Sequence, residues 1–128
     1  MTVLYTDKRF LDHETGNHRE RPERLRSIDA ELTRTGLAAK CQLAETRVAT
    51  VDELSKIHDR MHVERVEKFA KEGGGWIEAD TFLSPQSYDV ARRAAGTSLA
   101  AVDAVMKGPD TQVLAARAQL VLQPVRAP

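Results

Sequence analysis

The chain has 128 residues, enough for one domain with a modest hydrophobic core. Nineteen basic residues balance nineteen acidic ones and aromatic residues make up only 5% of the sequence, which argues against nucleic acid or an anionic membrane as a partner. The single cysteine, the lack of a membrane-spanning apolar run and the lack of a basic leader at the N-terminus predict a cytoplasmic protein.

The first third of the chain predicts two strands and a helix. The apolar run TVLY predicts a buried strand over residues 2–6. Pro22 is well placed to open a helix over residues 22–35, because a first-turn residue needs no backbone N–H, and Gly36 is suited to end it. The run KCQLAE predicts a second strand over residues 40–44.

Two longer helices follow. Thr50 and Glu53 have the spacing of a capping box, which predicts a helix over residues 51–71. A glycine triplet then ends that helix, and we expect GGGWIEADTFL to be a loop. Ser84 and Pro85 predict the start of a helix over residues 85–107. The expected buried stripe of that helix contains Tyr88, Ala91, Ala95, Leu99, Val102 and Met106. Alanines and Gly96 on the same helix indicate close backbone packing.

The chargeless run AQLVLQPV predicts a third strand over residues 118–125, buried on both faces like a central parallel strand. Residues 109–117 carry no clear pattern, and mobility is one interpretation of the whole region 109–128. Strands that alternate with helices predict an α/β fold with a small parallel sheet, in a single domain over residues 1–128. A central last strand needs a neighbour on each side, so the chain reads like the first part of a larger domain.

The stretch IHDRMH places His58 and His62 four residues apart, a spacing that helical zinc sites use. If Ile57 and Met61 mark the buried stripe, His58 lies at the edge of the buried face and His62 lies nearer solvent. No third ligand follows at a suitable spacing, and Asp59 is short for a general base. We therefore favour a packed, hydrogen-bonded His58 over a metal-binding pair.

Two loops leave alternatives open. HETGNHRERPERL is either a solvated loop with local ion pairs or an arginine-rich carboxylate site at the end of a strand. The glycine triplet is either a helix C-cap or a phosphate loop, and the C-cap is favoured because no GK[ST] ending follows.

Together these segments resemble a known family. HETGNHRERPERLRSI is similar to H-x-TG-x-HPERPxRL, and GGGWIEADTFLSPQSYDVARRAAG is similar to GGG-x-x-D-x-DT-x-x-SPxSYxxAxxAAG. SKIHDRMHVERV resembles a helix that carries VH-x-x-x-Y/H. These motifs belong to the zinc-dependent deacetylase superfamily, which includes histone deacetylases and acetylpolyamine amidohydrolases. The resemblance covers nearly all of residues 5–108.

The resemblance implies a partial arginase/deacetylase-like three-layer fold and a zinc-dependent hydrolysis of an acetyl amide on lysine or a polyamine. In the family two aspartates and a histidine hold the zinc, a histidine pair in RPPGHHA transfers protons and a tyrosine stabilises the oxyanion. If the final VRAP corresponds to VRPP, the chain stops just before that histidine pair. We therefore expect no catalytic residue, no metal ligand and no bound zinc in this chain, and no activity from it alone.

Three residues inherit a role by resemblance. Arg24 matches the arginine that lines the acetate-release cavity, Asp80 matches the rim aspartate that bonds the substrate backbone, and His18 lies in the loop at the channel entrance. Arg19 stands where the family has proline, which alters that loop. The alternative is a stand-alone binding or assembly module, which would form a homo-oligomer or complete its sheet with a protein partner.

Overall fold

A computed structural model describes residues 1–16, 21–108 and 111–117. Its main sheet has β1 (Thr2–Tyr5) in the middle, parallel both to β2 (Gln42–Ala44) and to β5 (Gln112–Ala115). Val3 lies opposite Gln42 on one side and Val113 on the other. The predicted α/β class with a small parallel sheet is therefore confirmed.

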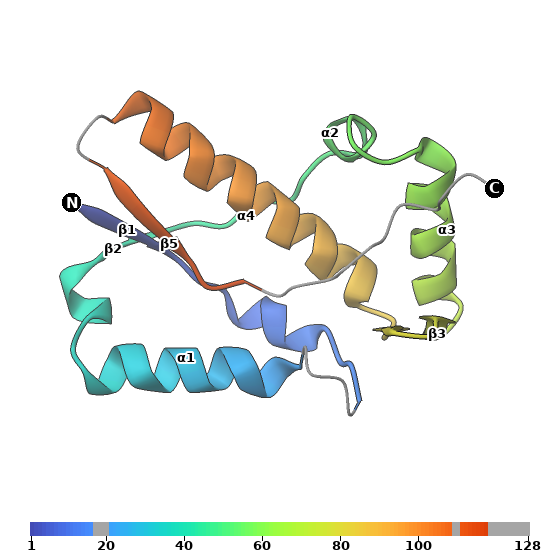
Figure 1. Cartoon of the computed structure of the whole chain (residues 1–128), viewed down its shortest axis with the longest axis horizontal. Coiled ribbons are helices and arrows are strands. Elements are labelled where there is room, and N and C mark those ends of the chain that lie inside the picture. Colours follow the sequence, from blue (N-terminus) through green and yellow to red (C-terminus); the bar gives the residue numbers. More distant parts are fainter. Residues whose placement is uncertain (17–20, 109–110, 118–128) are drawn as a thin grey trace.

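The remaining elements surround this sheet (Figure 1). They are η1 (Lys8–Asp12), α1 (Pro22–Arg34), η2 (Ala38–Lys40), α2 (Val51–Leu54), α3 (Arg60–Lys71), β3 (Gly75–Glu78), β4 (Thr81–Leu83) and α4 (Ser87–Lys107). Helix α4 crosses one side of the sheet and α1 lies below it, while α3 and the β3–β4 hairpin stand at the far end of α4. None of the helices in the described ranges is long and apolar enough to span a membrane.

The core lies where α4 meets its neighbours. Val3 and Tyr5 of the sheet pack on Ala101 of α4. A second cluster joins α1, η1 and α4, and it contains Phe10, Leu25, Val90, Ala94 and Ala116. A third joins α3 and the hairpin to the start of α4, and it contains Val63, Val66, Ala70, Leu83 and Tyr88. Helix α4 is thus the element that all three clusters share.

The local signals at helix ends are confirmed. Pro22 occupies the first turn of α1, and Gly36 follows that helix with a φ of 75°, a left-handed conformation that suits glycine. The capping box at α2 forms in both directions, because Thr50 Oγ1 accepts from the Glu53 N–H and the Glu53 carboxylate accepts from the Thr50 N–H.

The predicted helix over 51–71 is wrong in its middle. It breaks after α2, and α3 starts again behind Asp59, whose carboxylate caps the new helix by accepting from the Met61 N–H. The apolar residues expected to be buried face solvent: Ile57, in the turn between α2 and α3, is 82% exposed, and Met61 of α3 is 76% exposed. His62 is only 7% exposed and His58 is half-buried, the reverse of the expected order.

Two segments differ from the expected loop and strand positions. GGGWIEADTFL forms the antiparallel β3–β4 hairpin instead of a loop. Strand β5 lies inside 109–117, the segment without a clear sequence pattern. The strand expected over 118–125 lies outside the described residues, and within the described sheet β1 is the central strand.

The buried line of α4 also differs from the predicted stripe. Tyr88 is buried as expected, but Leu99, Val102 and Met106 are exposed. The helix instead buries a line of small residues, which includes Val90, Ala94, Thr97 and Ala101. The close approach at Gly96 is confirmed: a Cβ there would lie 2.2 Å from the Arg47 carbonyl oxygen, so α4 touches the backbone of the connection after β2.

Candidate functional site

The carboxyl ends of β1, β2 and β5 lie at the same edge of the sheet, where ligand sites of parallel sheets form. Asp7 follows β1 and Thr46 follows β2. Asp7 accepts two hydrogen bonds from the Arg9 guanidinium, at 2.9 and 2.7 Å, and one from the Thr46 hydroxyl. Arg93 of α4 reaches the same group, donating to Thr46 Oγ1 at 3.1 Å.

This cluster has a structural role, because the Asp7 carboxylate is already occupied as a hydrogen-bond acceptor within the fold. The hydrogen bonds from Arg9 are the main reason that the pKa of Asp7 lies far below its ordinary value, and Thr46 lowers it further. Arg93 Nη1 also lies 4.0 Å from the same carboxylate, and both side chains are largely buried. Asp7 therefore stays ionised and fully engaged, tying β1, the segment after β2 and α4 together.

Arg24 lies where β5 ends. From the first turns of α1 its Nη2 donates a 2.8 Å hydrogen bond to the carbonyl oxygen of Arg117, two residues beyond the strand. The side chain is half-buried. A guanidinium is a planar group with several N–H donors, a geometry suited to a carboxylate or carbonyl.

A buried polar cluster joins the HETG loop to the start of α4. His13 Nδ1 lies 2.6 Å from Ser87 Oγ, and Ser84 Oγ lies 2.9 Å from the same hydroxyl. The Ser84 hydroxyl accepts from the Glu14 N–H and donates to the Asp12 carbonyl. Ser87 has no exposed surface, so it cannot act as a nucleophile, and the cluster fixes the loop against the helix.

Asp80 lies on a different element of the fold from Arg24. Asp80 is exposed at the tip of the β3–β4 hairpin, where its carboxylate accepts a 3.2 Å hydrogen bond from the Thr81 hydroxyl. His18 lies outside the described residues. The structure therefore brings Arg24 to the sheet edge and Asp80 to a projecting hairpin, which are different elements of the fold.

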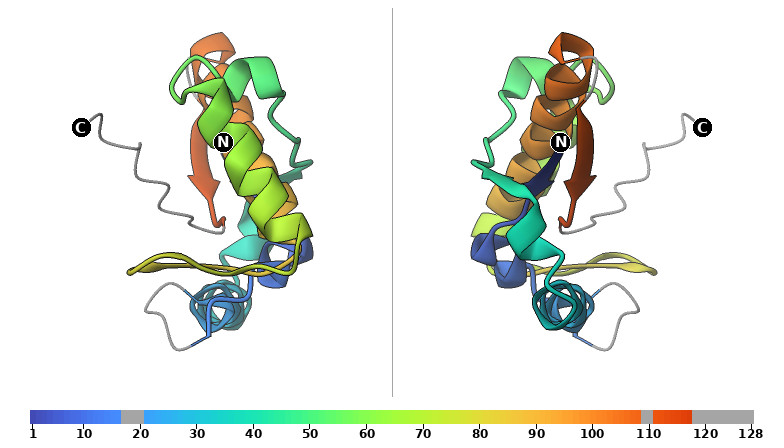
Figure 2. Two further views of the ribbon diagram at one scale, coloured as in Figure 1. Left: turned by 90° about the vertical axis from the view of Figure 1, so that its right-hand side faces the viewer. Right: turned by 90° about the vertical axis from the view of Figure 1, so that its left-hand side faces the viewer.

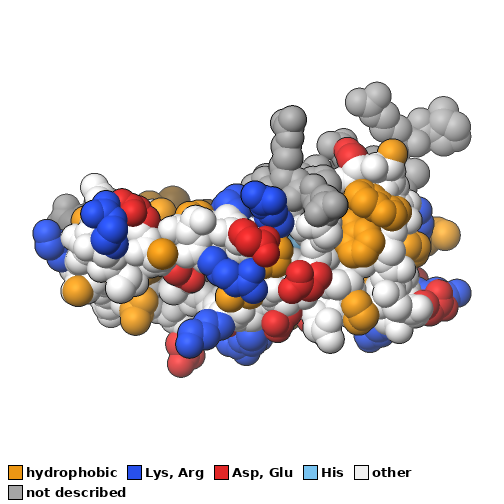
Figure 3. Space-filling model, turned by 90° about the horizontal axis from the view of Figure 1, so that it is seen from below, with side chains coloured by type: hydrophobic (Ala, Val, Ile, Leu, Met, Phe, Trp, Pro, Cys, Tyr) orange, Lys and Arg blue, Asp and Glu red, His pale blue; other side chains and the backbone are white. Residues whose placement is uncertain are grey.

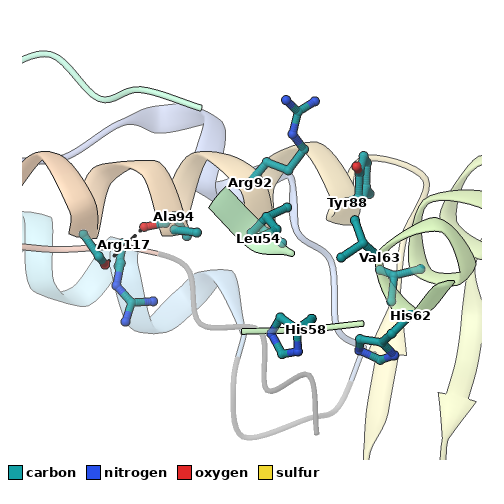
Figure 4. Close-up of a pocket in the computed structure, with 12 residues that line it drawn as sticks. Leu54, His58, His62, Val63, Tyr88, Arg92, Ala94 and Arg117 are labelled. Carbon is teal, nitrogen blue, oxygen red and sulfur yellow. Dashed lines mark hydrogen bonds between the residues drawn. The ribbon is translucent and has the colours of Figure 1, made fainter. Parts of the chain in front are cut away.

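His58 and His62 come together although they do not share a helix. Their ring centroids are 5.3 Å apart, and both border a cavity of about 240 Å³ between α2, α3 and α4 (Figure 4). Within the described ranges, His58 Nδ1 and both ring nitrogens of His62 are buried without a hydrogen-bond partner. Burial, followed by the neighbouring His58 and Arg65, lowers the pKa of His62. His58 is packed as predicted, but its Nδ1 is not hydrogen-bonded.

The described residues around the two histidines do not assemble a zinc site. The described part of the chain contains no group of three or more His, Cys, Asp or Glu side chains that could hold a metal ion. Arg92 and Arg117 also border the cavity beside the two histidines. As basic residues they supply no carboxylate ligand for a metal ion.

Sequence reasoning did not identify Ser87, Thr46 or Arg117 as part of these networks. Ser87 belongs to the SPQSY segment, so its motif was visible, but its bond to His13 joins positions 74 residues apart. Arg117 contributes a backbone carbonyl, which no side-chain pattern reveals.

Comparison with known proteins agrees with these motifs. The sequence profile of the histone deacetylase domain matches residues 18–122. A probable deacetylase of Methanothermobacter thermautotrophicus is 31% identical over 84% of this chain and 31% of its own length. A histone deacetylase-like amidohydrolase of Pseudomonas aeruginosa is 36% identical over 71% of this chain and 24% of its own length.

A solved structure of a related domain also resembles this chain. The crystal structure of the HDA15 HD domain superposes with a TM-score of 0.84 and 28% sequence identity, covering 91% of this chain and 34% of that one. The chain thus spans about a third or less of the length of these relatives.

Proposed function

Because the chain belongs to the histone deacetylase family, we propose that it forms the substrate-entrance part of a deacetylase domain and does not hydrolyse acetyl amides by itself. The supporting observation is which side chains lie at the carboxyl edge of the sheet and what they already bind. The Asp7 carboxylate there is already engaged by Arg9 and Thr46, and no metal-binding group occurs among the described residues. The sequence has four histidines, all before residue 63, and no two are adjacent. Zinc and proton-transfer chemistry would then come from other parts of the domain.

Arg24 and Asp80 would contribute binding rather than bond cleavage. A guanidinium such as that of Arg24 is suited to bind the carboxylate that leaves when an acetyl amide is hydrolysed. The exposed Asp80 carboxylate can accept a hydrogen bond from the backbone N–H of an acetylated peptide. His18 would border the entrance to the same channel. The substrates that fit this proposal are acetylated lysine side chains and acetylated polyamines.

Two assays test the proposal. The purified chain, supplied with zinc, should not release acetate from an acetyl-lysine peptide; turnover that a chelator abolishes would refute the claim of inactivity. A chimera that carries residues 1–108 in place of the matching part of the Pseudomonas aeruginosa relative should be active. In that chimera Arg24→Ala should lower kcat/KM on the order of tenfold or more. Arg26→Ala is the matched control, because Arg26 lies on the same helix and, among the described residues, its ion-pair partner is the exposed Glu23. Equal losses in both variants would count against a binding role for Arg24.

A second function, assembly, is favoured by the surface of α4. Leu99, Val102, Val105 and Met106 are all exposed, and Asp103 is the only charged residue between Ala94 and Met106. Strand β5 beside them pairs only with β1 within the described sheet, so its outer edge offers backbone donors and acceptors. A helix that is apolar on more than one face is typical of a buried position. This surface suits a second copy of the chain or a protein that completes the sheet.

Light scattering tests the assembly function. We expect a dimer at about 100 µM chain, and Val102→Glu should convert it to a monomer because the variant buries a charge in the contact. Ile57→Glu introduces the same charge at an exposed apolar residue outside α4 and should leave the dimer intact. A wild-type chain that remains monomeric at this concentration would rule out self-assembly.

A further inference from the structure

The cavity between α2, α3 and α4 is large and partly apolar. Helix α3 packs against the start of α4, with α2 at one end of α3 and the β3–β4 hairpin at the other (Figure 2). The cavity measures about 240 Å³, whereas an engineered cavity of roughly 150 Å³ already holds a benzene molecule. A ligand with a small ring therefore has room. The apolar walls are formed by Leu54, Val63, Val66, Ala91, Ala94 and Ala95.

Two histidines bring unsatisfied polar atoms to this cavity. Both ring nitrogens of His62, which is only 7% exposed, and Nδ1 of His58 are buried without a hydrogen-bond partner among the described residues. Figure 4 shows the two rings next to each other on the side of the cavity away from α4. A buried imidazole without a partner destabilises the fold, so these nitrogens need water or a polar ligand in the cavity.

The charge around the cavity has one sign. Among the described residues that line it, Arg92 and Arg117 are basic and none carries a carboxylate. Arg92 is fixed at the wall, because its Nε donates a 3.0 Å hydrogen bond to the Ala49 carbonyl oxygen. Tyr88 also lines the cavity, and burial raises the pKa of its hydroxyl to about 12, so it stays uncharged. The outer surface is different: Figure 3 shows basic and acidic side chains intermingled on one face of the molecule. The cavity is therefore suited to a negatively charged group.

Protonation of His62 is coupled to such a ligand. Burial and the neighbouring His58 and Arg65 lower the pKa of His62. The carboxylates of Glu78 and Asp59 act in the opposite direction with less effect. An anion in contact with the ring favours the charged imidazolium and raises this pKa again. Both nitrogens of the charged ring are donors, whereas only one nitrogen of the neutral ring is. Binding of an anion should therefore take up a proton.

We propose that this cavity binds an organic anion, an acid group joined to a small apolar body. His58 and His62 donate to the acid group, Arg117 adds its charge, and the apolar walls cover the body. Burial of the body distinguishes this ligand from inorganic ions, because they gain nothing from contact with apolar side chains. Arg24 is not among the described residues that line the cavity, so the site is distinct from the binding role proposed for that arginine.

Titration calorimetry of the chain tests the ligand class. Benzoate carries an acid group on a ring, benzyl alcohol carries the ring without the charge, and acetate carries the charge without the ring. We expect saturable binding of benzoate that is roughly tenfold or more tighter than binding of either other compound. Since binding takes up a proton, the benzoate affinity should fall about threefold or more between pH 6.5 and pH 8. No saturable heat with benzoate, equal affinity for another compound, or an affinity that does not change with pH would overturn the proposal.

Two variants test whether the histidines form the site. His62→Phe keeps a ring in the buried position and removes both nitrogens, so benzoate binding should weaken about tenfold or more. Arg65→Gln removes a positive charge that acts on His62, but Arg65 is exposed and does not line the cavity, so this variant should bind benzoate as well as wild type does. Equal weakening in both variants would indicate general attraction to positive charge and refute the site.

Nuclear magnetic resonance of the wild-type chain gives a readout that needs no variant. Benzoate should raise the pH at which the His62 ring protonates by about half a unit or more, because the bound anion stabilises the imidazolium. An unchanged protonation of His62 at saturating benzoate would also refute the proposal. None of these measurements uses hydrolysis of an acetyl amide, so the outcome of the deacetylase assays leaves them unaffected.

Discussion

Replacing Gly96 with alanine should destabilise the protein, although alanine is the better helix former. The Cβ of alanine would lie 2.2 Å from the Arg47 carbonyl oxygen, 2.6 Å from the Ala49 nitrogen and 2.7 Å from the Val48 carbonyl carbon. All three are backbone atoms, so they cannot rotate away as a side chain would. Either α4 or the segment 47–49 has to move by about 1 Å to restore normal contact.

That movement costs more than the helix gains. Two hydrogen bonds cross the contact, from the Ala49 N–H to the Arg92 carbonyl at 2.8 Å and from Arg92 Nε to the Ala49 carbonyl at 3.0 Å. Each contributes about 1 kcal/mol, and overpacking typically costs about 1–3 kcal/mol. The higher helix propensity of alanine offsets about 1 kcal/mol of this loss of stability. We expect a net loss of about 2–4 kcal/mol in the free energy of unfolding.

Urea unfolding followed by circular dichroism measures this loss. Asp103→Ala is the control, because it changes an exposed position of the same helix and should stay within about 0.5 kcal/mol of wild type. If Gly96→Ala proved as stable as wild type, the close crossing of α4 over residues 47–49 would be incorrect.

Two further predictions concern pH. Since the folded-state pKa of His62 is lowered, the unfolded chain binds the proton more readily, and stability should fall as pH drops through the ordinary value of 6.5. Hydrogen exchange of α3 amides at pH 7 and pH 5 should show this loss, and His62→Phe should remove it; an unchanged loss in the variant would assign it elsewhere. The folded-state pKa of Asp7 is also depressed, so its effect has the same sign: its contribution to stability is fully present above the ordinary 3.8 and is lost progressively as the pH falls below that value. Asp7→Asn should therefore be less stable than wild type at pH 6 in urea unfolding, and the difference should shrink as the pH falls towards 2; a constant difference at both pH values would contradict the ion pair with Arg9.

Local signals of the sequence predicted helix ends well. Pro22, Gly36 and the Thr50–Glu53 capping box act within one turn of the chain, so the surrounding fold does not change them. The break before α3 was also signalled, because Asp59 is a favourable N-cap residue, but the apolar spacing of Ile57 and Met61 pointed to a continuous helix. Spacing alone did not distinguish a buried stripe from an exposed one.

The position of α4 was harder to predict for a different reason. Its large apolar residues, including Leu99 and Val102, point to solvent, and small residues such as Ala94 and Ala101 face the core. Ranking by hydrophobicity favours the large side chains, whereas close contact with a backbone requires small ones. The β3–β4 hairpin was predicted to be a loop, because the three glycines before it are typical of loops. The β-forming residues around Trp76 and Phe82 were given less weight than those glycines.

The order of the sheet has a consequence for synthesis of the chain. Strand β1 is synthesised long before its second neighbour, β5, which begins at Gln112. At roughly 5–20 residues per second, some 6 to 20 s pass before the ribosome has added that partner. During this time one edge of a strand whose last three residues are buried in the folded protein has no native neighbour, and contacts between such distant residues also form slowly. The nascent chain should therefore depend on holding chaperones more than a helical bundle of the same length does.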